Sequence, residues 1–298
     1  MGANLGQKST VTDGLVLCLD AGNPSSGNII MPVSDLVDSG FSAASAPDNN
    51  VAWNYVAGGD TYFVATAPQG GAANQFAYSK DGVSWTSASP SASNWWSNIG
   101  FGNGKFVITS GGSSNGIQYA SESNISSWTG VTPPETNAWK GITYGNGKFV
   151  TVAWNGTNRV MYASDSDLSS WTLASAAEQN GWRGVAYGDG KFVAVSEDGT
   201  NRVMYSSDGI NWTSASAAED NEWYGIAYGD GYFVAVARTG TNRIMYSSDG
   251  VHWTSASAPF AKLWTNIAFG DGYFVSVQYQ DNNTVDWNNV MWAKSSDL

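Results

Sequence analysis

The sequence predicts an all-β protein built from six copies of one four-stranded unit. The pattern W-x-x-(I/V)-x-(Y/F)-G-x-G-x-F, with one degenerate first copy, begins at Trp53, Trp96, Trp139, Trp182, Trp223 and Trp264. Successive copies lie 41 or 43 residues apart, which is the period of a four-stranded propeller blade. The chain holds 35 Gly, 15 Trp and 14 Tyr but only 13% charged residues, a composition that favours strands and turns over helices.

Within one unit, the residue types predict each strand in turn. In the copy at Trp182, "WRGVAYG" and "KFVAVS" form the first two strands. They are joined by "GDG", where Asp-Gly supplies the positive φ values of a tight hairpin. The polar loop "EDGTN" leads to the third strand, "RVMYSS", and "DGIN" turns the chain into the fourth, "WTSAS". The sequence therefore predicts a six-bladed β-propeller over residues 41–298, with blades starting near the six repeat tryptophans.

The last copy supplies three strands and stops at "VMWAKSSDL", residues 290–298. Residues 41–47, "FSAASAP", are similar to "WTSASAP" at 253–259, with Phe41 in the place of the tryptophan. An open sheet edge invites edge-to-edge pairing, so we expect a further strand to cover this one. We predict that residues 41–46 complete the last blade and close the ring in a 3+1 arrangement.

The turn between the third and fourth strands carries the motif S-x-D-G-x-x-W, at 79–85, 206–212 and 247–253. This motif resembles the Asp box of sialidase-type, or BNR, propellers, shortened by one residue. The resemblance covers residues 41–298 and implies a structural role without marking an active site. It implies that Asp81, Asp208 and Asp249 close the turn, and that the aromatic residues pack between sheets, namely Trp85, Trp128, Trp171, Trp212 and Trp253.

The first forty residues do not fit the repeat. Their segment "VTDGLVLCLDAGNPSSG", residues 11–27, is similar to the opening of structural proteins of large tailed phages, especially marine ones. The resemblance implies that residues 1–40 are an arm that docks the propeller onto other virion subunits in an oligomeric assembly. An extra strand packed under the propeller is the alternative. Cys18, the single cysteine, lies in the apolar run "LVLCL" and is expected to be a buried small hydrophobe.

Charge and hydropathy disfavour two classes of partner. The net charge is −12 and the 13 Lys and Arg are scattered, so no basic face for nucleic acid or an anionic membrane surface is expected. No run approaches the about 18 apolar residues of a membrane span. The start "MGANLGQKST" lacks the apolar region of a secretory signal, which predicts synthesis in the host cytoplasm. The resemblance to phage structural proteins implies a final location in the virion.

Catalysis has little support in the sequence. The sialidase resemblance would require an arginine cluster, a Tyr–Glu nucleophile pair and an acid Asp. Three of the five arginines share one repeat position, "TNR", and so project from different blades. The single histidine, His252, supports neither a catalytic triad nor a metal site. The "GDG" turns are explained as hairpins without calcium. We therefore predict a non-enzymatic protein with no metal and no cofactor.

Ligand binding is the expected function. An aromatic plane beside amide and guanidinium donors suits sugar recognition. The candidate residues are Trp139, Trp182, Trp223 and Trp264, the pairs Asn158–Arg159, Asn201–Arg202 and Asn242–Arg243, and Trp287 in the long loop 278–289. Packing in the core is the alternative for the repeated tryptophans. We predict a tail, fibre or capsid-surface protein that contacts host surfaces, including cell-surface glycans, or neighbouring subunits. A multivalent lectin and a glycan-active enzyme are the second and third alternatives.

Overall fold

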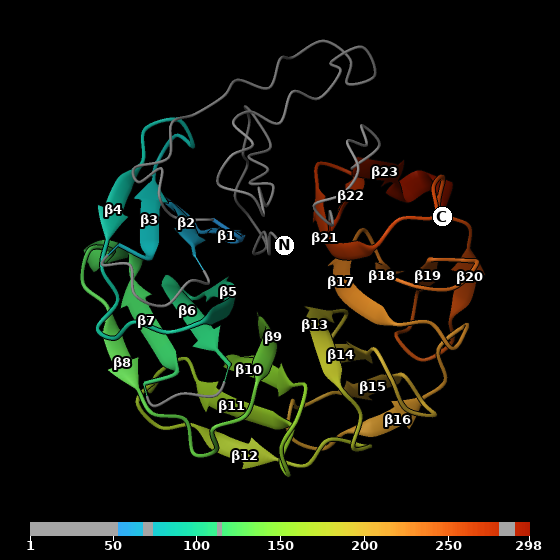
Figure 1. Cartoon of the computed structure of the whole chain (residues 1–298), viewed down its shortest axis with the longest axis horizontal. Coiled ribbons are helices and arrows are strands. Elements are labelled where there is room, and N and C mark those ends of the chain that lie inside the picture. The colour runs from blue at the N-terminus through green and yellow to red at the C-terminus, as the bar shows by residue number, and fades with distance from the viewer. Residues whose placement is uncertain (1–52, 68–73, 112–114, 280–289) are drawn as a thin grey trace.

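The computed structural model describes residues 53–67, 74–111, 115–279 and 290–298. These residues form six antiparallel sheets around a central axis, which confirms the predicted six-bladed β-propeller (Figure 1). Five sheets have four strands, and the last has three within the described part of the chain. The predicted closing strand at 41–46, the arm at 1–40 and Cys18 lie outside these residues. In the described ranges, no helix is long and apolar enough to cross a membrane.

Each blade runs outward from the axis in chain order (Figure 1). The innermost strands are β1 (Tyr55–Gly58), β5 (Trp96–Gly102), β9 (Trp139–Gly145), β13 (Trp182–Gly188), β17 (Trp223–Gly229) and β21 (Trp264–Gly270). The second strands are β2 (Phe63–Thr66), β6 (Lys105–Ser110), β10 (Lys148–Ala153), β14 (Lys191–Ser196), β18 (Tyr232–Ala237) and β22 (Tyr273–Gln278). The third strands are β3 (Phe76–Ser79), β7 (Ile117–Ser121), β11 (Val160–Ser164), β15 (Val203–Ser206), β19 (Ile244–Ser247) and β23 (Val290–Lys294). The outermost strands are β4 (Thr86–Ala88), β8 (Thr129–Val131), β12 (Thr172–Ala174), β16 (Thr213–Ala215) and β20 (Thr254–Ala256), and the short 3-10 helices are η2 (Glu122–Asn124) and η3 (Ser295–Asp297).

Tight turns join the first two strands of the last five blades, as the Asn-Gly and Asp-Gly pairs predict. Asp189 and Gly190, between β13 and β14, have φ values of 46° and 72°. The equivalent residues Asn103, Asn146, Asp230 and Asp271 have φ values of 44–49°. Both central residues of a two-residue hairpin turn of this type need positive φ, which Asn, Asp and Gly adopt most readily. The inner hairpins are therefore set by local sequence.

The core lies in layers between neighbouring blades. One layer combines Val150 and Val152 of β10 with Trp182 and Phe192 of the next blade. Trp139, Trp182, Trp223 and Trp264 are all 0% exposed. The Trp182 indole N–H is satisfied within this layer, because it donates to the Glu178 carbonyl at 3.1 Å. The expectation that these four indoles stack on a ligand is therefore corrected. Their faces are covered by the adjacent blade.

A glycine and an aromatic ring form the seam between consecutive blades. A Cβ placed on Gly188 would lie 2.0 Å from Cγ of Tyr228 in the next blade. The same arrangement pairs Gly102 with Tyr144, Gly145 with Tyr187 and Gly229 with Phe269. The (Y/F)-G step of the repeat thus has a packing reason, because the ring of one blade occupies the space left by the missing side chain of the previous blade.

Aspartates hold the outer turns through backbone hydrogen bonds. Asp208 Oδ1 accepts from the N–H groups of Ile210 and Asn211, both at 2.8 Å, and from Ser206 Oγ at 2.9 Å. Asp81 and Asp249 have the same arrangement in their turns.

Four of the tryptophans expected to pack between sheets do contact the hydrophobic layers between blades, namely Trp128, Trp171, Trp212 and Trp253.

These turns predict a loss of stability in acid. The N–H groups of Ser84 and Val83 lower the pKa of Asp81 from 3.8 to about 2, and the N–H of Asn211 likewise lowers the pKa of Asp208. A carboxylate with a depressed folded pKa stabilises the fold fully above its unfolded pKa, and this contribution is lost as the pH falls through the folded value. We expect the melting temperature to fall between pH 4 and pH 2, and to fall less in Asp81→Asn/Asp208→Asn. An identical pH dependence in the double variant would contradict this.

Candidate ligand-binding site on the loop face

The loops after each second strand and the linkers before each first strand emerge on one side, here called the loop face, because these strands are antiparallel. The asparagines predicted to bind a ligand lie on this face, but their side chains are hydrogen-bonded to other residues of the protein. Asn201 Nδ2 donates to Glu178 Oε1 at 2.6 Å, and Asn180 Nδ2 donates to the Asn201 carbonyl at 2.6 Å. Asn158 and Asn242 make the same bonds to Glu135 and Glu219. Each asparagine thus clamps its loop to the linker of the same blade.

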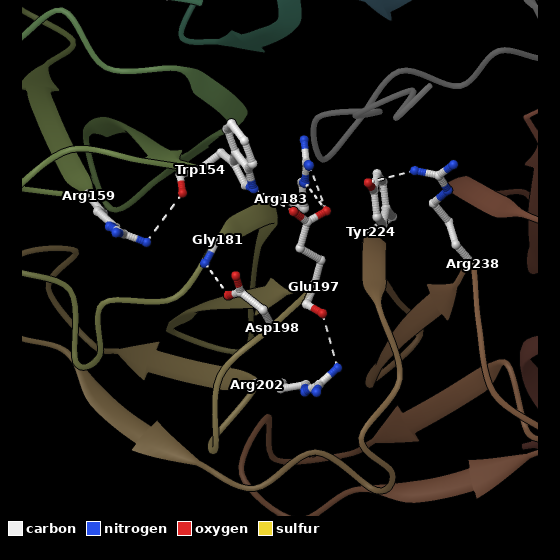
Figure 2. Close-up of polar contacts among 9 residues, drawn as sticks. All are labelled: Trp154, Arg159, Gly181, Arg183, Glu197, Asp198, Arg202, Tyr224 and Arg238. Atoms are coloured by element: carbon white, nitrogen blue, oxygen red, sulfur yellow. Dashed lines mark hydrogen bonds and ion pairs between the residues drawn. The ribbon is translucent and has the colours of Figure 1, made fainter.

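The arginines of the "TNR" loops also bond to backbone. Arg202 Nη1 donates to the carbonyls of Glu197 at 3.0 Å and Asn221 at 2.8 Å, and so ties one blade to the next linker. Arg243 repeats this arrangement, and Arg159 bonds to the carbonyl of Trp154 (Figure 2). The expected ligand contacts of these Asn–Arg pairs are corrected to loop-stapling contacts. Trp287 lies outside the described residues.

The structure brings a different set of side chains together near the axis. Trp154, Arg183, Tyr224, Arg238 and Tyr279 alternate aromatic rings with guanidinium groups across four blades, and we call them the aromatic–arginine row. The Arg183 guanidinium lies 5.2 Å from the Trp154 ring and 4.7 Å from the Tyr224 ring. The Arg238 guanidinium lies 4.9 Å from the Tyr224 ring and 5.7 Å from the Tyr279 ring. Cation–π attraction therefore acts along the whole row.

Backbone irregularity places part of this row. Trp182 pairs with Ser196 and Gly184 pairs with Val195, so Arg183 sits unpaired at a β-bulge. Tyr224 occupies the same bulge in the next blade. A bulge adds one residue to the strand and redirects its side chain. The other three members directly follow the ends of β10, β18 and β22, at the start of the loops. The five blades that begin at β5, β9, β13, β17 and β21 each have this register shift, so each offers two positions to this part of the loop face.

Glu197 neutralises the first half of the row (Figure 2). Its Oε2 lies 2.6 Å from Arg183 Nη2, with the two side chains 16% and 18% exposed. The Trp154 indole N–H also donates to Glu197. Burial opposes ionisation of Glu197, but the hydrogen bond from Tyr224 and the charge of Arg183 lower its pKa below 4.5. Burial and the hydrogen bond to Glu197 raise the pKa of Tyr224. Arg183 and Glu197 are therefore a charged, hydrogen-bonded pair.

In the second half of the row, the positive charge of Arg238 is not balanced by a carboxylate of the described residues. Its Nη1 donates to the Tyr224 hydroxyl at 2.8 Å (Figure 2). Within the described ranges Arg238 makes no ion pair, and its Nε is buried without a hydrogen-bond partner. Buried polar groups in folded proteins are nearly always paired, and an unpaired one calls for an explanation. An anion supplied from outside the chain would satisfy both the charge and the free donor.

Sequence reasoning missed the row, although a signal was present. At the position after the repeat tryptophan, the six copies carry Asn54, Ser97, Lys140, Arg183, Tyr224 and Thr265, whereas the tryptophan itself is the same in all six. A position that differs in every copy marks a side chain that the scaffold does not require. Across the part of the chain that the structure describes, no group of three or more His, Cys, Asp or Glu side chains could hold a metal ion.

Comparisons with known proteins show the fold alone. No family model and no curated sequence matches the chain. Virginiamycin B lyase from Staphylococcus aureus matches with a TM-score of 0.66 and 14% identity, over 81% of this chain and 84% of that chain. The computationally designed Ika8 protein matches at 0.55 and 14%, over 76% and 67%. A nidogen/laminin complex contains a chain that matches at 0.55 and 12%, over 73% and 84%. The first of these proteins is an enzyme, but a match at 14% identity shows a shared fold and does not carry its activity over to this chain.

Proposed function

We propose that the chain is a non-enzymatic binding propeller on a phage virion, as a tail, fibre or capsid-surface component. Its loop face holds a ligand on the aromatic–arginine row. The observation that carries this proposal is the exposure of both ends of the row, because Trp154 is 43% and Tyr279 is 50% exposed. Exposed aromatic rings beside fixed polar groups give apolar stacking together with orientation, which suits sugar rings on a host surface.

The position of the row supports binding over a purely structural role. The stapling bonds of the loops use repeated residues, whereas the row uses residues that differ from blade to blade. Trp154 and Tyr279 keep 43% and 50% of their surface exposed, so core packing alone does not account for them. Aromatic and arginine side chains are also the residue types that contribute most often to binding energy at interfaces.

The virion location rests on residues 11–27, whose similarity to phage structural proteins motivates a docking role for residues 1–40. A virion component should copurify with assembled particles and remain with them after washing in salt. A protein recovered only as a free small oligomer that binds glycans would instead support the alternative of a multivalent lectin. In either case, the proposed binding surface is the loop face.

Binding by the row has a direct test on a glycan array with the intact chain. We expect Trp154→Ala and Tyr279→Ala each to weaken binding about tenfold or more, because both remove an exposed ring. The matched control is Trp292→Ala, which removes a similarly exposed tryptophan, 53%, from the third strand of a blade. Equal losses in all three variants, or no glycan bound by the intact chain, would refute binding at the row.

A glycan-active enzyme is the second candidate, because Tyr224 is hydrogen-bonded to Glu197 beside two guanidinium groups. The raised pKa of Tyr224 opposes formation of the anionic nucleophile that such chemistry would use, and for this reason binding is placed first. Release of sugar from a panel of glycosides that is abolished in Tyr224→Phe would reverse this order.

A further inference from the structure

We infer that the ligand of the row carries an anionic group, a carboxylate or a sulfate ester, which binds at Arg238. This inference rests on the proposed function and narrows it from a glycan to an acidic polysaccharide. Its basis is the contrast between the two arginines of the row, which lie in similar aromatic surroundings but differ in their partners.

Arg183 shows how an arginine of the row is satisfied by groups of the chain itself. Its Nη2 and Nε lie 2.6 Å and 2.7 Å from Glu197 Oε2, while its guanidinium lies near the rings of Trp154 and Tyr224. Arg238 has the corresponding rings, Tyr224 and Tyr279, but in the described residues it has no carboxylate. Among the described residues, no carboxylate therefore does for Arg238 what Glu197 does for Arg183.

The local charge also favours an anion. Lys140, Arg183 and Glu197 act on one another electrostatically, and the charge of Arg183, after burial, lowers the pKa of Lys140. Arg238 adds a further positive charge beside Tyr224, and among the described residues the one ion pair of the row is that of Arg183 with Glu197. The chain as a whole has a net charge of −12, so it repels polyanions unless a local positive site receives them. An acidic polysaccharide that binds this protein must therefore engage such a site.

The free edge of Arg238 suits two oxygens. Its Nη1 donates a hydrogen bond to the Tyr224 hydroxyl, whereas Nε and Nη2 make no hydrogen bond to the described residues. These two donors form the planar fork that binds a carboxylate or sulfate through two parallel hydrogen bonds. Nε is covered, so engagement of both donors requires a neighbouring side chain to move. We expect this to be Tyr279, because its ring lies 5.7 Å from the guanidinium and is 50% exposed. A hydroxyl of a neutral sugar would leave the positive charge unmatched.

Three polysaccharide probes test the inference, with their affinity for the full chain measured by isothermal titration calorimetry at constant salt concentration. Heparin presents sulfate, polygalacturonate presents carboxylate, and dextran presents neither. We expect one or both acidic probes to bind, and dextran to bind at least tenfold more weakly. Arg238→Gln should reduce the affinity for the acidic probe about tenfold to a hundredfold, because a charge-assisted hydrogen-bond pair is lost. Arg238→Lys should recover only part of it, because an ammonium group lacks the fork.

The matched control is Lys191→Gln, which removes one positive charge from the opposite end of a blade, where β14 begins. Equal losses in Arg238→Gln and Lys191→Gln would show that only the net charge matters, and would overturn the inference. Binding of dextran as tight as that of the acidic probes, with Trp154→Ala still weakening it, would overturn the anionic ligand but keep the proposed function. If no probe and no arrayed glycan binds, both are wrong.

Discussion

Trp182→Ala is expected to lower the free energy of unfolding by about 3–5 kcal/mol, the usual cost of removing a fully buried tryptophan. The side chain is 0% exposed and packs between Val150 and Val152 of one blade and Phe192 of its own. Its removal leaves a cavity between two sheets that are each held by their own hydrogen bonds, so the gap cannot close without moving a whole blade. Urea denaturation followed by tryptophan fluorescence and circular dichroism measures the change.

Trp154→Ala is the matched comparison, because it removes the same side chain from a 43% exposed position on the loop face. Its cost in stability should be below about 1 kcal/mol, the usual range for exposed positions. The two variants should therefore separate stability from binding. A Trp182→Ala protein with wild-type stability would show that the tryptophan layer does not hold the blades together.

Gly188→Ala should cost about 3 kcal/mol, at the upper end of ordinary overpacking. The added methyl group would lie 2.0 Å from Cγ of Tyr228, and Cγ is close to the backbone, so rotation of the ring cannot relieve the clash. The neighbouring blade has to shift instead. Because this Gly–aromatic contact recurs at four blade boundaries, the result measures how much one boundary contributes to the ring.

A double-variant cycle isolates this contact. Gly188→Ala in the background of Tyr228→Ala should cost far less than in the wild-type chain, because the ring that clashes is gone. Gly190→Ala controls for backbone strain. It has a φ of 72°, and its new methyl group would meet no atom within 4 Å, so about 1 kcal/mol is expected. Strictly additive costs in the cycle would mean that the clash with Tyr228 is not the cause.

The fold could be predicted from the sequence because each element has a local signal that recurs. Asp189–Gly190 encodes its own turn, and the 41- or 43-residue period sets the number of blades. What a periodic pattern does not contain is the direction in which a repeated side chain points. Trp182 fits a core position and a sugar-stacking position equally well on paper. The choice between them depends on where the next blade packs.

The candidate site was predicted less well for the same reason. The "TNR" loops attract notice because they repeat, yet Asn201 and Arg202 are fully engaged with Glu178 and the backbone. These partners lie about twenty residues away in sequence or in the next linker, so their pairing appears only in three dimensions. Arg183 and Arg238 occupy different positions of the unit, and only the packing of adjacent blades brings their guanidinium groups to 4.7 Å and 4.9 Å from the Tyr224 ring.

The asparagine clamps have a consequence for how recognition can change over time. Because Glu178, Asn180 and Asn201 fix the loop by bonds among themselves, no side chain of the row is needed to keep that loop in shape. Substitutions at the two row positions of a blade can then accumulate without unfolding the frame. The same propeller can therefore present a different row of side chains after a handful of point changes, without a new fold.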